Sequence, residues 1–241
     1  MKLPILLSIP HAGRNIPGEV QDICILTENN ILEDGDAGAA EIYYPLQKEV
    51  EAFVTTDIAR AIVDMNRAEN DFWKDGVIKT HTCWNVPVYS TYPSENTVKE
   101  LISRYHRPYH SQLSILGKKV KLGIDCHTMA AVAPPVAPDK GKERPPVCLS
   151  NAEWTCPQEW IESLSLHLSS SLGYDVSINQ PFMGGHIIRT HAHEIPWIQI
   201  EYSRALFLNN EQKSTKLLQA LKDWLSHLLG SSKDRFIKAK Q

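Results

Sequence analysis

Short apolar segments that alternate with segments of helical periodicity are the feature that most limits what this chain can fold into. The apolar segments have the length of β-strands and lie at 4–9, 53–58, 121–125, 175–179 and 196–202. Apolar residues recur at helical spacing in 38–53, in 157–173, and in a stripe from Leu217 to Leu229 that ends at Gly230. Strands that alternate with helices predict an α/β fold, with a mostly parallel mixed sheet flanked by helices.

The length of 241 residues and the apolar share of 42% support a substantial hydrophobic core. We interpret residues 1–241 as a single domain. The segment 130–147 is rich in Pro and Ala, and it is predicted to form a long loop that leaves the strand at 121–125. The tail after Gly230 is expected to fray.

Charge, hydropathy and cysteine content exclude several classes of protein. The formal net charge is −3 and the only basic block is a short one at 233–240, which argues against a nucleic-acid partner. The apolar run at the N-terminus is too brief for a signal peptide, and no run approaches the ~18 residues of a membrane span. Five widely spaced cysteines without a CxxC pair indicate free thiols in a reducing cytoplasm. The oligomeric state stays unknown at this stage.

Polar side chains follow several of the predicted strands. His11 comes after 4–9, and His127 comes after 121–125. Asn66 and Arg67 follow an apolar stretch at 61–65, and Glu201 lies at the end of 196–202. Because open α/β sheets bind ligands at the carboxyl ends of their strands, we expect these side chains to meet in one site.

The residue types at these positions are typical of a mononuclear metal hydrolase. Catalytic zinc takes three protein ligands from His, Asp or Glu and keeps one position open. His11 and His127 offer two nitrogens, and Asp34 or Asp36 offers a carboxylate. A separate carboxylate must then take the proton of the attacking water, and Glu201 is the candidate at a strand end.

Each of these residues also has an ordinary structural interpretation. A single histidine at a strand end is more often a packed, hydrogen-bonded residue than a ligand. Asp36 could cap the helix that begins near Gly38, and Glu201 could form a buried ion pair with Arg204. It is their coincidence at strand ends that favours a site.

Two further histidine segments leave alternatives open. The segment 183–194 combines a Gly-Gly pair with histidines, and its His191-x-His193 spacing fits either a metal site or a polar hairpin. His106 and His110 share one helical face, although Pro108 weakens the helix.

Cys126 stands next to His127, an arrangement that raises the possibility of a thiol nucleophile. Neighbouring residues on a strand point to opposite faces, so we expect Cys126 to pack in the core instead.

The order of the short motifs resembles that of the N-formylglutamate amidohydrolase family. More distantly, it resembles the zinc carboxypeptidase and aspartoacylase–succinylglutamate desuccinylase group. The motifs are SIPHAG at 8–13, DGD at 34–36, DMNR at 64–67, RPYH at 107–110, DCHTM at 125–129, GGHIIR at 184–189 and QIE at 199–201. The resemblance implies a phosphorylase/hydrolase-like α/β fold and a metal-dependent hydrolase that cleaves an amide of an acidic amino-acid derivative.

The resemblance also implies roles for individual residues. His11 and His127 match the metal histidines, and Glu201 matches the glutamate that activates water. The carboxypeptidases place a glutamate three residues after the first histidine, where this chain has Arg14. An acid of the DGD motif must substitute, and family spacing favours Asp36.

The remaining motif residues are expected around the substrate. The Asn66–Arg67 pair resembles the pair that holds a substrate carboxylate. Arg189 is expected in the same pocket, because a dianionic substrate needs two cationic partners. His110 is a further candidate for substrate binding. Asp125 and His186 are expected to hydrogen-bond to the metal ligands and orient them without binding the ion themselves.

The function that these expectations imply is hydrolysis of N-formyl-L-glutamate to formate and glutamate, with one divalent ion, most simply Zn²⁺. One alternative keeps the chemistry and changes the acyl group or uses a peptide. Another is a non-catalytic binding protein with the same fold and metal.

Overall fold

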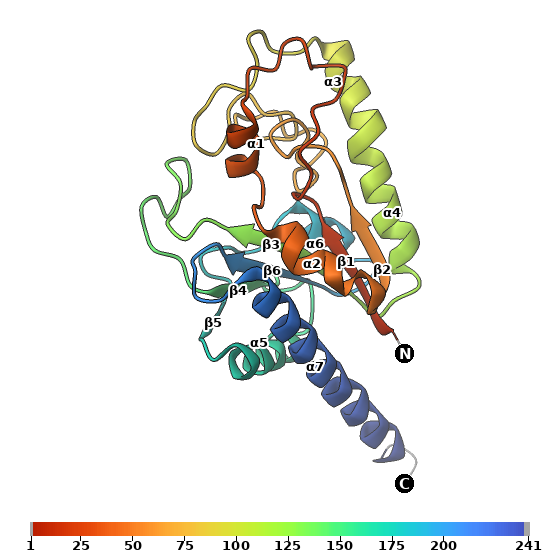
Figure 1. Ribbon diagram of the computed structural model, residues 1–241. Helices are drawn as coiled ribbons and strands as arrows, with labels where there is room; N and C mark the ends of the chain where they lie inside the picture. The colour runs from red at the N-terminus through yellow and green to blue at the C-terminus, as the bar shows by residue number, and fades with distance from the viewer. Residues whose placement is uncertain (1, 239–241) are drawn as a thin grey trace.

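The computed structural model describes residues 2–238, and it contains one six-stranded sheet with helices on both faces (Figure 1). The strands are β1 (Leu3–Ile9), β2 (Val50–Thr55), β3 (Leu122–Met129), β4 (Val147–Ser150), β5 (Val176–Ile178) and β6 (Trp197–Ser203). The α-helices are α1 (Glu28–Asp34), α2 (Ala39–Tyr43), α3 (Glu95–Leu101), α4 (Arg107–Gly117), α5 (Gln158–Leu172), α6 (His186–His191) and α7 (Asn210–Lys238). A 3₁₀-helix, η1 (Tyr44–Lys48), follows α2, and a π-helix, η2 (Ile102–His106), precedes α4.

The sheet has the order β2-β1-β3-β6-β4-β5 and is mostly parallel. Only the pairing of β4 with β6 is antiparallel among the described strands. The predicted mixed α/β sheet is therefore confirmed. β4 was not predicted, because its four residues follow a Pro-rich segment and show no alternation; the loop consequently ends at 146.

Successive side chains of the central strands point to opposite faces of the sheet, so the two faces contribute to two separate hydrophobic cores. Ile5, Leu7 and Ile9 of β1 contribute to the core beneath α2, α5 and α7, and Leu6 contributes to the core beneath α3 and α4. In Figure 1, α5 and α7 lie on one side of the sheet and α4 lies on the other. In β6, Ile198 and Ile200 belong to the first core, so Gln199 and Glu201 point to the α4 side, as the alternation predicted.

Two predicted helix ends are wrong. The helical pattern expected over 38–53 stops at Lys48, and Val50 and Phe53 lie in β2, where parallel pairing with β1 outweighs local periodicity. Helix α7 continues past Gly230 to Lys238, since an interior Gly weakens a helix by only ~1 kcal/mol.

Helix α5 agrees with its sequence signals. It starts directly after Pro157 and ends at Gly173, whose backbone is left-handed with φ of 78°. Its buried leucines pack against α7.

The segment from 56 to 94 is the part of the fold that most affects the site. It contains turns and isolated bridges between β2 and α3, and many of its apolar residues are buried in the core that α3 and α4 share, although Phe72, Trp73 and Tyr92 are exposed. The stretch 61–65, expected to behave as a strand, is one of these buried turns. Long ordered segments of this kind are usually functional.

Within residues 2–238 no helix combines the length and apolar composition that crossing a membrane would need. All five cysteines are free, and Cys126 is fully buried in the core on the face opposite His127, as expected.

A candidate metal and catalytic site

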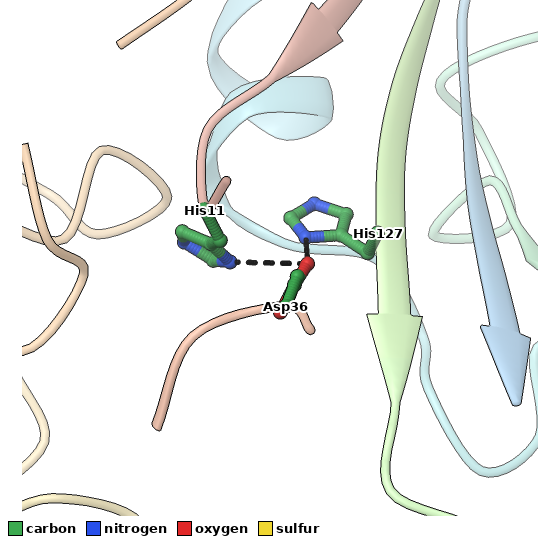
Figure 2. Close-up of side chains that lie close together, drawn as sticks. All are labelled: His11, Asp36 and His127. Carbon is green, nitrogen blue, oxygen red and sulfur yellow. Dashed lines mark hydrogen bonds and ion pairs between the residues drawn. The ribbon is translucent and has the colours of Figure 1, made fainter. Parts of the chain in front are cut away.

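Two histidines and an aspartate converge at the carboxyl edge of the sheet (Figure 2). His11 follows β1, His127 lies near the end of β3, and Asp36 lies in the turn between α1 and α2. The Asp36 Oδ2 atom is 3.6 Å from His11 Nδ1 and 3.0 Å from His127 Nδ1. All three side chains are buried, and one ligand atom of each lies within 4.8 Å of the others.

The far nitrogen of each imidazole is bound to a carboxylate. His11 Nε2 lies 2.8 Å from Asp64 Oδ1, and His127 Nε2 lies 2.8 Å from Asp125 Oδ2. A carboxylate accepts, so both Nε2 atoms donate; without an ion His127 Nδ1 also donates, to Asp36 Oδ2 at 3.0 Å, whereas with an ion between them the two Nδ1 atoms would offer their lone pairs to it. This carboxylate–histidine arrangement is the one that orients metal-ligating imidazoles in proteins.

A buried nitrogen without a hydrogen-bond partner also indicates a metal ion at this position. His11 Nδ1 is buried and has no hydrogen-bond partner, although buried polar atoms are normally paired. Two imidazole nitrogens and a carboxylate oxygen are the ligands that divalent zinc prefers. The residues therefore fit a divalent cation held by His11, Asp36 and His127.

The two anchoring aspartates are themselves fixed. Asp125 accepts from Ser8 Oγ at 3.0 Å and from Asn66 Nδ2 at 3.3 Å. Asp64 accepts from Arg60 Nε at 3.0 Å. Burial alone would raise the pKa of Asp64, but the charges of His11 and Arg60 outweigh it and hold the pKa well below its usual range. Asp64 therefore stays ionised and keeps the proton of His11 on Nε2.

The geometry distinguishes Asp36 from Asp34. Asp34 is buried away from the histidines, where it accepts from the Cys83 backbone N–H at 2.6 Å and from Lys79 Nζ at 3.2 Å. The Asp36 side chain does not cap α2, whose N-cap is Gly38 with no side-chain hydrogen bond. Its Oδ2 instead accepts from the Thr128 backbone N–H at 3.1 Å, which aims the carboxylate at the histidines.

Glu201 lies opposite His127 in the pairing of β3 with β6 and is 6% exposed. Its Oε1 accepts from Gln199 Nε2 at 2.9 Å, and Arg204 forms no ion pair with it. Arg204 instead donates to the backbone carbonyls of Glu33 and Gly35, so the buried-pair interpretation of Glu201 is not supported. Burial raises the pKa of Glu201 to about 7, with the nearby His127 acting in the opposite direction.

The three convergent residues open onto a cavity of about 330 Å³ that Glu201 also lines. The Pro-rich loop after β3 forms one wall of the cavity, which gives that loop a place in the site. Four arginines line the cavity, namely Arg60, Arg67, Arg144 and Arg204. The cavity has the size of a small-molecule site, and its charged lining combines these four arginines with Asp34, Asp36, Asp75 and Glu201.

Asn66 and Arg67 both line the cavity, as predicted, but their polar atoms are already engaged. Asn66 Nδ2 lies 3.2 Å from His127 Nε2 as well as contacting Asp125, and its Oδ1 accepts from the Ile187 backbone N–H at 2.8 Å. Arg67 binds the carboxylate and the backbone carbonyl of Asp75, each at 2.7 Å.

Three predicted site residues lie outside the cavity. Arg189 is exposed and donates to the Gly184 carbonyl at 3.2 Å, so the expectation that it shares a pocket with Arg67 is wrong. His110 Nε2 donates to the Met65 carbonyl at 2.9 Å, behind the cavity wall. The His186 imidazole hydrogen-bonds to Thr190 Oγ1 and packs against His110, and it contacts neither His11 nor His127.

The segment 186–191 is helix α6 and not a hairpin. His191 is buried and lies 2.9 Å from His110, whereas the side chain of His193 is 73% exposed. The HxH spacing therefore does not form a metal site, because α6 ends at His191 and the turn that follows places the His193 side chain in solvent.

Sequence reasoning missed the charged residues of the 56–94 segment. Asp64 stands in the DMNR motif but has no pattern that marks it as the partner of His11. Lys79 is fully buried beside Asp34, Asp64 and Asp75. A single lysine directly after the apolar pair at 77–78 was the available signal, since lysine is almost never fully buried without a partner.

Fold and site together define the class of protein: a single-sheet α/β protein with a candidate mononuclear metal centre and a buried carboxylate at the carboxyl edge of its strands. Residues 3–208 match the N-formylglutamate amidohydrolase family, and the chain belongs to that family.

Known proteins with similar sequences and structures agree with this assignment. The chain is 24% identical to an N-formylglutamate deformylase of Pseudomonas putida over 253 aligned positions, which cover 92% of this chain and 94% of the relative. An N-formylglutamate deformylase of Pseudomonas aeruginosa is 22% identical, with 87% and 84% covered. Among solved structures, the N-formylglutamate amidohydrolase of Ralstonia eutropha JMP134 superposes with a TM-score of 0.71 at 17% identity, with 97% and 95% covered. That likeness supports the fold.

Proposed function

We propose that this protein is a metal-dependent amidohydrolase that hydrolyses N-formyl-L-glutamate to formate and L-glutamate. The observation that carries the proposal is the convergence of His11, Asp36 and His127 next to the buried carboxylate of Glu201 in one cavity. Membership in the family and the names of the two Pseudomonas relatives support the choice of substrate.

His11, Asp36 and His127 would hold the ion, with Asp64 and Asp125 keeping the imidazoles in the correct tautomer. A divalent ion bound there supplies Lewis-acid chemistry: it polarises the formyl oxygen and makes a water easier to deprotonate. Zn²⁺ is the simplest candidate for this donor set.

Glu201 acts as the general base and then as the general acid. It takes a proton from the attacking water and passes it to the leaving amine, so that the C–N bond breaks and formate and the free amine are released. Burial of its carboxyl group places the pKa close to neutral, where one group can both accept and donate a proton. The Gln199 amide, which itself accepts from the Gly185 N–H, fixes the orientation of the carboxylate.

The cavity suits a small dianion. Its lining combines four arginines with four carboxylates and contains no lysine, so the positive charge is presented as planar guanidinium groups that match carboxylate geometry. We retain Arg67 as a candidate carboxylate-binding residue at the wall of this cavity. Binding to Arg67 would require sharing its existing pair with Asp75.

A panel of N-acyl glutamates and aspartates tests the proposal with purified, zinc-loaded protein. N-formyl-L-glutamate should be turned over with the highest kcat/KM, and chelation should abolish turnover. A strong preference for an acetyl, succinyl or peptidyl group would instead indicate another N-acyl substrate. Turnover of none of them would indicate a binding protein that keeps the fold and the metal.

A further inference from the structure

The four arginines of the cavity differ in whether their charge is already neutralised. Arg60 binds Asp64, and Arg67 binds Asp75. Arg144 makes two hydrogen bonds of 2.9 Å to Asp139 and lies over the Phe182 ring at 4.7 Å. Each of these three guanidinium groups therefore has a carboxylate partner within the protein.

Arg204 has no carboxylate partner among the side chains that the structure describes, those of residues 2–228. One of its nitrogens, Nη1, donates to the Glu33 and Gly35 carbonyl oxygens, each at the long distance of 3.4 Å. The Glu33 oxygen already accepts a shorter bond of 3.1 Å from Trp84. A guanidinium group has five donors, so most of those on Arg204 are unused.

The backbone of Arg204 is fixed beside the cavity. Arg204 follows β6 directly, and its N–H donates to the Met129 carbonyl at the end of β3 at 2.9 Å. It lies three residues after Glu201, and its half-buried side chain lines the same cavity. A half-buried cation without a counterion leaves an unfavourable charge that an incoming carboxylate would neutralise.

We propose that Arg204 is the primary carboxylate-binding residue of the cavity and binds one of the two carboxylates of the substrate through its free donors. A carboxylate that binds Arg204 need not displace an internal partner, whereas binding at Arg60, Arg67 or Arg144 must compete with an aspartate. The proposal rests on the proposed function for the identity of the substrate, although not for the presence of an anion site.

Ligand binding tests the anion site without reference to turnover. Glutarate, titrated calorimetrically into zinc-loaded wild type, Arg204→Gln and Arg189→Ala, should bind the Arg204 variant ~10- to 100-fold more weakly. Arg189→Ala is the matched control, because it removes an exposed arginine outside the cavity and should bind as the wild type does. Arg204→Lys should be intermediate, since it keeps the charge and loses the planar fork. Equal glutarate affinity in wild type and Arg204→Gln, with both proteins folded by their melting temperatures, would overturn the proposal.

Substrate selectivity then identifies the carboxylate. We compare N-formyl-L-glutamate with its α-amide and its γ-amide, each of which lacks one carboxylate. Arg204→Gln should lower kcat/KM by ~10- to 100-fold, mainly through KM, for the diacid and for one amide only. The other amide lacks the carboxylate that Arg204 binds, and its kcat/KM should change little.

Two other results have separate meanings. An equal fall of kcat for all three compounds would assign Arg204 to the transition state instead and overturn the proposal. If the wild type hydrolyses none of the compounds, the proposed function fails, and the glutarate titration still decides whether Arg204 is the carboxylate site.

Discussion

Glu201 is the residue whose substitution distinguishes an enzyme from a binding protein. Its carboxyl group is buried, oriented by Gln199 and free of an ion pair with Arg204. Glu201→Gln should therefore fold, retain metal and bind substrate, while kcat falls by ~10²-fold or more through loss of a general base. Melting temperature, metal content and turnover of this variant provide the check. A variant that melts early yet keeps its kcat would make Glu201 a structural acid.

The proposed metal ligands lead to a prediction that distinguishes Asp36 from Asp34. Metal analysis should find near-stoichiometric Zn²⁺ in the wild type and a sharp loss in His127→Ala and Asp36→Asn, because each removes one of three donors. Asp34→Asn serves as the contrasting variant: it should keep its metal and lose stability, since Lys79 then remains buried with one partner fewer. The opposite pattern would show that the ligand is Asp34.

The pKa of Glu201 predicts how stability depends on pH in protein stripped of metal. Its folded pKa of about 7 lies above the reference value of 4.5. The stability that protonated Glu201 provides is thus fully present below about pH 4.5 and is lost as the pH rises through about 7. Relative to wild type, Glu201→Gln should gain ~3 kcal/mol of unfolding free energy as the pH rises between those limits. Denaturant melts at several pH values measure this, and parallel curves for the two proteins would contradict it.

At the scale of elements, the turn into α6 controls the position of Asn66. A Cβ atom on Gly185 would lie 2.3 Å from Asn66 Nδ2, and Asn66 is held by Asp125, to which Nδ2 donates, and by the Ile187 N–H, from which Oδ1 accepts. The close approach of α6 to the 56–94 segment therefore requires glycine at 185.

Gly185→Ala should destabilise the protein by ~1–3 kcal/mol and weaken metal binding, because Asn66 must move away from His127 and its anchor Asp125. Gly18→Ala is the control, since nothing lies within 4 Å of a Cβ built there. Unfolding free energies and zinc titrations compare the two variants. Equal metal affinity in Gly185→Ala and wild type would show that Asn66 does not support the site.

Several histidines that stand out in the sequence do not line the cavity, because they hydrogen-bond to the backbone behind it. His106 and His110 donate to the carbonyls of Arg67 and Met65, one on each side of Asn66. Burial lowers the pKa of His110 to about 3, with a further contribution from His106, so the imidazole is neutral. These side chains hold the backbone of the 56–94 segment in place behind the site.

At the scale of the whole molecule, metal removal should lower the melting temperature. Asp36 and Glu201 are buried within one site, beside the histidines that Asp64 and Asp125 anchor, and a bound cation offsets the repulsion among these acids. A ligand that binds only the folded state at ~1,000 times its Kd adds ~4 kcal/mol of stability. Thermal melts with zinc and with a chelator should therefore differ in wild type and coincide in Asp36→Asn. Coincident melts in the wild type would argue against a metal held by this triad.

The sequence by itself determined the class of fold and the central residues of the site. Alternating periodicities specify strands and helices locally, and parallel strands bring whatever follows them to one edge. His11, His127 and Glu201 could be found in this way because each lies on or directly after a buried strand. Whether Cys126 or His127 faces the core also follows from alternation alone.

Only the tertiary structure decided which charges are satisfied. In the sequence Arg67, Arg189 and Arg204 are all simply arginines. In the structure Arg67 pairs with Asp75, Arg189 is exposed, and Arg204 lines the cavity with no counterion among the described side chains. Those partners come from segments far apart in the chain, notably the irregular 56–94 segment, whose path no periodicity encodes. Ion pairing and burial depend on distances between side chains, and those distances exist only once the chain is folded.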